Sequence, residues 1–87
     1  MAIRVFKKTA LQIAFGKMVR LKRECLSISQ ESLAEKADLN TNYIGSIERG
    51  ERNIGLEVLY RLAYALKTHP KNLLPEYTEG KFGIPIK

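Results

Sequence analysis

Residues 30–50 carry hydrogen-bonding side chains where two short helices and a tight turn are expected. Thr41, Asn42 and Ser46 fall on the predicted outward face of the second helix, and Arg49 stands at its end. Amide, hydroxyl and guanidinium groups in this arrangement suit base-pair edges, since asparagine can bond adenine twice and arginine can bond guanine twice. Helix, turn and polar helix together are typical of proteins that read the major groove of DNA.

Capping residues predict the bounds of this helix-turn-helix unit. Ser29 is a good N-cap for a helix over residues 30–37, and Asn40 for a helix over residues 41–49. Between them, Asp38 stands where the chain needs a left-handed residue, which Asp tolerates better than most residues other than glycine. Ala34 is small, as two helices that cross at a steep angle require near their contact.

The flanking sequence predicts further helices that form a scaffold. A helix from Thr9, its N-cap, to about Leu26 has a core stripe repeating every four residues: Leu11, Phe15 and Val19. A helix over residues 56–67 buries Leu59, Leu62, Ala63 and Leu66, and a short one runs from Pro70 to Leu74. We expect an all-α, compact bundle of five short helices, with a basic arm at 1–8, the domain at 9–75 and a tail at 76–87.

Continuing the stripe of the first helix by four residues places Arg23 toward the core. A charge in that position is costly unless it finds a partner, so a carboxylate partner is expected.

The 87-residue length predicts one small domain, and the formal net charge of +6 favours a polyanionic partner. The first 23 residues contain no acidic side chain and seven basic ones, which form either a solvated face or a flank near phosphates: Arg4, Lys7, Lys8, Lys17, Arg20, Lys22 and Arg23. No apolar run approaches the roughly 20 residues of a membrane span, and no convincing signal peptide is present. We expect a cytoplasmic protein.

An enzyme, a metal site and a cofactor have little support in this sequence. The single Cys25 excludes an internal disulfide and a multi-thiolate metal site, and the single His69 precedes a proline. The carboxylates are scattered, and no glycine-rich phosphate loop or ligand-binding constellation is evident.

Characteristic residue types recur at fixed spacings through both helices and the turn: Ser29, Gln30, Leu33, Ala34, Ala37, Leu39, Asn40, Tyr43, Ile44, Ile47, Glu48, Arg49 and Gly50. Together they resemble the phage Cro/repressor-type, or lambda repressor-like, helix-turn-helix family over about residues 15–74. The run Asn42-Tyr43-Ile44, followed by residues 48–54, further resembles restriction–modification controller proteins.

This resemblance implies a role for each polar position. Base contacts are expected from Thr41, Asn42, Tyr43, Ser46 and Arg49, and phosphate contacts from Gln30, Asn40, Arg52 and Asn53. Arg23 and Glu48 are expected to form a structural ion pair between the first and third helices. Asp38 replaces the usual turn glycine, and Gly45 leaves the middle of the recognition helix bare, so more of the readout falls on phosphates and DNA shape.

A single unit of this kind covers few base pairs, so a homodimer on near-palindromic operator DNA is expected. The candidate interface lies on the last two helices and the tail: Tyr60, Tyr64, Leu73, Leu74 and Tyr77. The function that fits is a transcriptional regulator, either the controller of a restriction–modification operon or a phage-type repressor. An antitoxin that binds DNA and a toxin protein is the alternative, and a pure protein-interaction module is a third reading.

Overall fold

The computed structural model describes residues 8–76, in which four α-helices precede one 3-10 helix and no strand occurs. The elements are α1 (Ala10–Cys25), α2 (Gln30–Ala37), α3 (Thr41–Glu48), α4 (Leu56–Ala65) and η1 (Pro70–Leu73). The expected fifth α-helix is therefore wrong in type, because the chain makes only a 3-10 turn there. Residues 1–7 of the expected basic arm and residues 77–87 of the expected tail lie outside the described residues.

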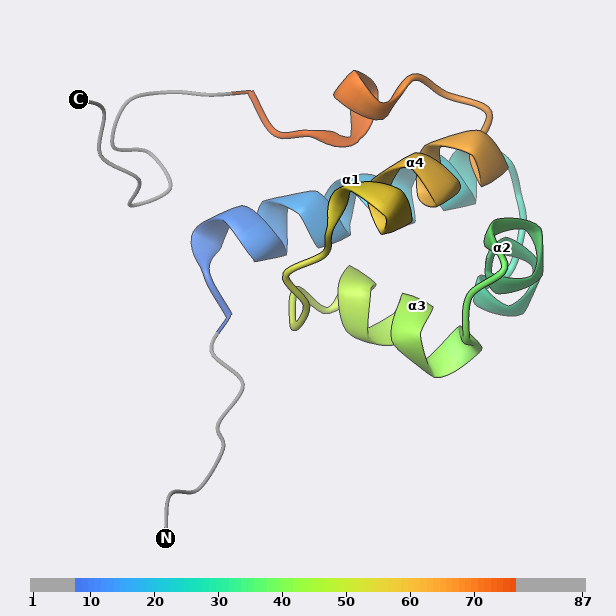
Figure 1. The fold of residues 1–87 in the computed structure, drawn as a ribbon, viewed down its shortest axis with the longest axis horizontal. Coiled ribbons are helices and arrows are strands. Elements are labelled where there is room, and N and C mark those ends of the chain that lie inside the picture. Colours follow the sequence, from blue (N-terminus) through green and yellow to red (C-terminus); the bar gives the residue numbers. More distant parts are fainter. Residues whose placement is uncertain (1–7, 77–87) are drawn as a thin grey trace, which may run out of the picture.

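In Figure 1, α3 lies below and η1 above the centre of the molecule, where α4 and α1 overlap in this view. The core lies between these elements and draws on all five of them. Its fully buried large side chains are Leu33, Ile44, Ile47, Leu62, Leu73 and Val19. Because α3 contributes two of these side chains, only its remaining surface is available for recognition.

Side-chain caps fix the helix ends where the sequence predicts them. The Thr9 hydroxyl accepts from the Gln12 amide at 3.0 Å, and the Gln12 side chain accepts from the Thr9 amide at 2.9 Å, a reciprocal capping box. The Ser29 hydroxyl caps α2 by accepting from the Ser32 amide at 3.0 Å. The Asn40 side-chain oxygen caps α3 by accepting a hydrogen bond from the backbone N–H of Asn42 at 2.7 Å.

The turn between α2 and α3 has the predicted left-handed residue. Asp38 adopts φ 57° and ψ 50°, and the Leu39 amide then donates to the Ala34 carbonyl at 2.8 Å. Leu39 packs against the core and holds the turn to the bundle.

Gly16 makes possible a close crossing of α1 and α3 that sequence analysis missed. A Cβ atom at this position would collide with the Ile47 carbonyl oxygen and would lie 2.8 Å from the Glu48 carbonyl oxygen. Both atoms belong to the backbone of α3, which cannot move aside as a side chain can. The signal was present in the sequence, since Gly16 lies inside the helix predicted from Thr9 to Leu26, where glycine is unfavourable unless packing requires it.

We predict that Gly16→Ala destabilises the fold by about 1–3 kcal/mol or more, because the added methyl group forces α1 away from α3. Gly45→Ala is the matched control. There the nearest atom to an added Cβ is the Arg49 Nη1, 3.2 Å away at the end of a flexible side chain. Alanine also gains up to about 1 kcal/mol of helix propensity over glycine. Urea unfolding checks both variants, and a Gly16→Ala protein as stable as the unmodified chain would contradict the close crossing.

Candidate nucleic-acid interface

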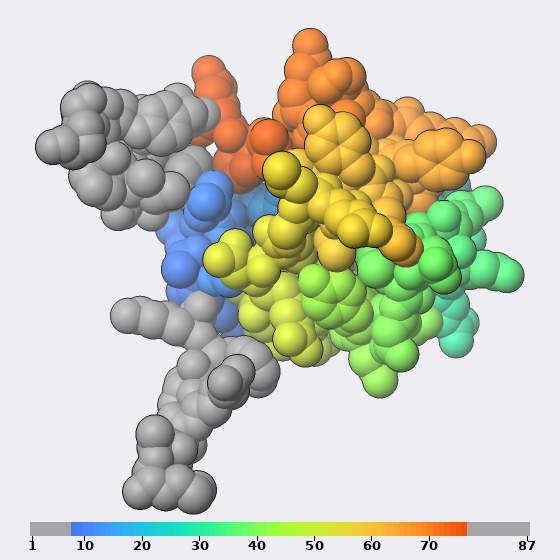
Figure 2. Space-filling view, viewed as in Figure 1, coloured from blue at the N-terminus to red at the C-terminus, as the bar shows by residue number. Residues whose placement is uncertain are grey.

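The outer surface of α3 and the loop that follows it, residues 51–55, are open to solvent in the described part of the chain (Figure 2). Asn42 is exposed at the start of α3, with Thr41 half-buried beside it. Asn53 is exposed in the loop, and Asn40, also exposed, uses its side-chain oxygen as the helix cap. The amide group of Asn42 thus projects from the end of a helix whose other side is core.

A buried ion pair fixes α3 to α1. Arg23 Nε donates to Glu48 Oε2 at 2.6 Å, and Arg23 Nη2 donates to Glu48 Oε1 at 3.0 Å. The two side chains are 13% and 4% exposed, so little solvent screens this bidentate pair. The side-chain hydrogen bonding that Arg23 donates to Glu48 is the main cause that raises the pKa of Arg23. The charge that the sequence places on a core-facing stripe therefore has a carboxylate partner.

Two further hydrogen bonds extend this pair into α2 and the preceding loop. Gln30 Nε2 donates to Glu48 Oε1 at 3.0 Å, and Arg23 Nη1 donates to the Ile28 carbonyl at 2.9 Å. Gln30 also lies against Gly45, where an added Cβ would stand 3.6 Å from its Oε1. The first residue of α2 is thus braced against α3, while its backbone N–H stands at the positive end of the helix dipole.

Ser46 does not face outward as the sequence analysis expected. Ser46 is only 4% exposed, and its hydroxyl donates a hydrogen bond to the Tyr43 carbonyl at 2.7 Å. Arg52 Nε donates to the same hydroxyl oxygen at 3.0 Å. The expectation was wrong because the chain after α3 folds back and lays Arg52 beside Ser46.

Arg52 also lies over the ring of Tyr43, with its guanidinium carbon 5.4 Å from the ring centroid. This is within the distance of a cation–π contact. Tyr43 is half-buried and packs against the core, so the ring offers a fixed surface. The three side chains of Tyr43, Ser46 and Arg52 form one cluster at the edge of the open face.

Arg49 is held by a neighbouring carboxylate. Its Nε and Nη2 donate to the two carboxylate oxygens of Glu51 at 3.0 and 3.3 Å, and this hydrogen bonding is the main cause that lowers the pKa of Glu51. Lys8 Nζ lies 3.9 Å from the same carboxylate. An Arg49 that contacts DNA must exchange Glu51 for the new partner.

The expected interface residues differ in exposure. Tyr60, Tyr64 and Leu74 are 60%, 83% and 49% exposed, whereas Leu73 is fully buried in the core and is wrong as an interface residue. Tyr77 lies outside the described residues. Leu56 was missed and is 75% exposed at the start of α4.

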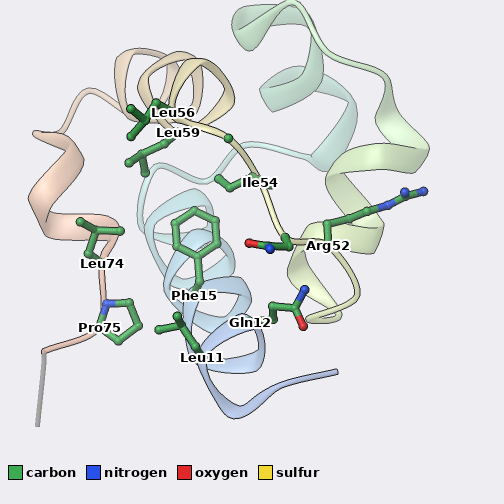
Figure 3. Close-up of a pocket in the computed structure, with 11 residues that line it drawn as sticks. Leu11, Gln12, Phe15, Arg52, Ile54, Leu56, Leu59, Leu74 and Pro75 are labelled. Atoms are coloured by element: carbon green, nitrogen blue, oxygen red, sulfur yellow. The ribbon is translucent and has the colours of Figure 1, made fainter. Parts of the chain in front are cut away.

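Leu56 borders an apolar groove of about 390 Å³ that sequence analysis did not anticipate. Figure 3 shows Phe15 at its centre, with Ile54 and Leu59 on one side and Leu74 and Pro75 on the other. The groove arises where α1, the loop after α3, α4 and the chain after η1 meet, so no local sequence pattern indicates it.

In residues 8–76 no group of three His, Cys, Asp or Glu side chains is arranged to hold a metal ion. Within the same range, none of the helices has the length and hydropathy of a bilayer span.

A family model described as helix-turn-helix matches residues 19–73. Over 71 residues the chain is 42% identical to Control protein C.BamHI from Bacillus amyloliquefaciens, covering 80% of this chain and 88% of that protein.

The solved structures that share this fold include two controller proteins. The restriction-modification controller protein C.AhdI from Aeromonas hydrophila matches with a TM-score of 0.71 and 38% identity, over 72% of this chain and 96% of that one. The controller protein C.Esp1396I, solved as a tetramer in complex with its natural 35 base-pair operator, matches with a TM-score of 0.71 and 26% identity, over 76% and 87% of the two chains.

We predict that Glu48→Gln costs about 3–5 kcal/mol of unfolding free energy, because it leaves the Arg23 guanidinium without its counter-charge in a site with little solvent. Glu24→Gln is the matched control. Glu24 pairs with Arg20 at 3.0 Å, but both side chains are more than half exposed. That change is expected to cost less than about 1 kcal/mol. Urea unfolding measures both, and equal effects would contradict a structural role for the buried pair.

Proposed function

Because the chain belongs to the helix-turn-helix family that includes the control protein C.BamHI, we propose that it is a transcriptional regulator that controls a restriction–modification operon. It acts by binding operator DNA and is not an enzyme. The operator complex of C.Esp1396I supports DNA as the partner, since that protein shares this fold over 87% of its length. We place its action in the cytoplasm, where such an operon lies.

The observation that carries this proposal is the way α3 is held. Part-buried hydrogen bonds from Arg23 and Gln30 converge on Glu48 at the C-terminal end of the helix, while Asn42 is exposed at its other end. A helix fixed in this way can enter the major groove without losing orientation. The net charge of +6 adds attraction to phosphates.

The polar side chains of this face fall into two groups, one that contacts bases and one that contacts phosphates. Thr41 and Asn42 at the start of α3 read base edges, with Asn42 able to bond adenine in two places. Tyr43 contacts the DNA backbone or a thymine methyl group, and Arg49 reaches a base after leaving Glu51. Ser46, which is buried, is removed from the base-reading set.

Phosphate contacts come from both sides of α3. Gln30 and Asn40 stand at the N-terminal ends of α2 and α3, where backbone N–H groups and helix dipoles favour an anion. Arg52 and Asn53 follow α3 in the exposed loop. These four positions surround the base-reading end of the helix and set its register on the duplex.

The test is a mobility shift of the purified chain with its own upstream DNA at two salt concentrations. We expect a sequence-selective shift that weakens with salt. Asn42→Ala should relax the base preference and leave non-selective binding intact, whereas Arg52→Ala should weaken binding to all sequences and lower the salt slope by about one unit. A folded chain with no selective shift would contradict the proposal and direct attention to a protein partner, as in the antitoxin reading.

We also propose that the regulator binds as a homodimer, since two recognition helices about one helical turn apart match a near-palindromic site. The apolar groove and the exposed Leu56, Tyr60 and Leu74 form the surface that a second copy would cover. Large exposed apolar side chains around a groove are typical of such interfaces. Tyr64, further along α4, extends this surface.

Leu56→Glu is expected to shift the monomer–dimer equilibrium at least about tenfold toward monomer, because it places a charge on the apolar interface. Folding should not suffer, since Leu56 is the first residue of α4 and a carboxylate is favourable at a helix N-terminus. Leu21→Glu is the control, at a leucine that is 53% exposed on α1 and does not line the groove. Sedimentation velocity measures both, and dissociation by both variants or by neither would argue against this interface.

A further inference from the structure

We propose that Ser46 is a positioning residue whose buried hydroxyl orients Arg52 toward DNA phosphate. Ser46 then sets the affinity for DNA through Arg52, without touching a base. This inference rests on the proposed function and assigns a different role to a residue that the sequence placed among the base contacts.

The direction of the hydrogen bonds supports this role. A serine hydroxyl has one proton to donate and two lone pairs that accept. The Ser46 proton is used on the Tyr43 carbonyl at 2.7 Å, so the oxygen faces Arg52 only as an acceptor, and Arg52 Nε donates to it at 3.0 Å. The hydroxyl rotor is thereby fixed by the helix backbone rather than by the arginine that it holds.

Arg52 is held on a second side by the ring of Tyr43, 5.4 Å below its guanidinium carbon. Both contacts of Arg52 depend on Tyr43. Its carbonyl orients the Ser46 hydroxyl, and its ring lies under the guanidinium. Figure 3 shows the Arg52 side chain extending away from Leu74 and Pro75 at the far wall of the apolar groove. The side chain therefore leaves the loop in a defined direction, and binding costs less rotamer entropy than for an unrestrained arginine.

The group that accepts a hydrogen bond from Arg52 differs in charge from the group that accepts hydrogen bonds from Arg49. Arg49 donates two hydrogen bonds to the Glu51 carboxylate, whereas the Ser46 oxygen that receives Arg52 Nε is neutral. Arg52 also acts on Glu51 through space, since its charge is among the causes that lower the pKa of that carboxyl. The Ser46 hydroxyl thus fixes the direction of the Arg52 Nε–H without itself adding a negative charge.

The experiment is a double-mutant cycle on DNA affinity with Ser46→Ala, Arg52→Ala and the double variant, using the upstream operator and an unrelated duplex. We expect Ser46→Ala alone to weaken binding to both duplexes about three- to tenfold, the range for one modest hydrogen bond, with base preference unchanged. In the Arg52→Ala background the same change should have no further effect. Thr68→Ala is the control, because it removes another hydroxyl that accepts from a side chain, that of Asn72 at 3.1 Å.

A second measurement reports on Arg52 without DNA. In ¹⁵N-edited NMR spectra of the full chain, the Arg52 Nε–H should exchange slowly with water in the unmodified protein and faster in Ser46→Ala. Thermal unfolding of each variant separates this local change from a loss of fold.

Several outcomes would overturn the inference. They are an unchanged affinity in Ser46→Ala, an equal loss of affinity with and without Arg52, and an altered base preference. An unmodified chain that bound no duplex selectively would overturn the proposed function together with this role. Selective binding that is insensitive to Ser46→Ala would overturn the role alone.

Discussion

The carboxylate of Glu48 is the point on which the orientation of α3 depends. It accepts hydrogen bonds from Arg23 on α1 and from Gln30 on α2. The backbone carbonyl of the same residue, Glu48, lies against Gly16. Polar bonds and a close backbone crossing thus act on the same end of one helix. Since a buried charge is tolerated only with well-placed partners, this arrangement holds α3 at one angle to α1 and α2. The buried apolar side chains of α3 stabilise the fold, and the hydrogen bonds at its C-terminal end fix the orientation of the helix.

Because the core and the Glu48 hydrogen bonds already hold α3 in place, its exposed face can carry few long polar side chains. Gly45 and the buried Ser46 leave the middle of α3 without a long side chain. In the proposed function, base reading therefore falls to Thr41, Asn42 and Tyr43 at the start of α3 and to Arg49 after its end. Arg49 and Arg52 lie beyond the helix, one against a carboxylate and the other against a hydroxyl and a ring. In the proposed function, much of the affinity then comes from phosphates, and sequence preference comes from few direct contacts together with DNA shape.

The parts that sequence predicts well are those decided by neighbouring residues. Caps at Thr9, Ser29 and Asn40 and the left-handed Asp38 follow from local hydrogen bonding and sterics, and the structure has all four. The misses depend on distant segments: Ser46 is covered because residues after α3 fold back, and Leu73 is buried by packing of η1 on α1 and α4. The apolar groove is likewise a product of four segments meeting, which no periodicity reveals.

The most direct test of the account is an amide NMR titration of the full chain with its upstream operator duplex. The account predicts that the largest shift changes fall on Thr41, Asn42 and Tyr43, on the N-terminal amides of α2, and on the loop from Glu51 to Asn53. The exposed end of α1 near Cys25 should remain unchanged. Changes centred instead on that end of α1, with the start of α3 unaffected, would contradict DNA recognition by α3.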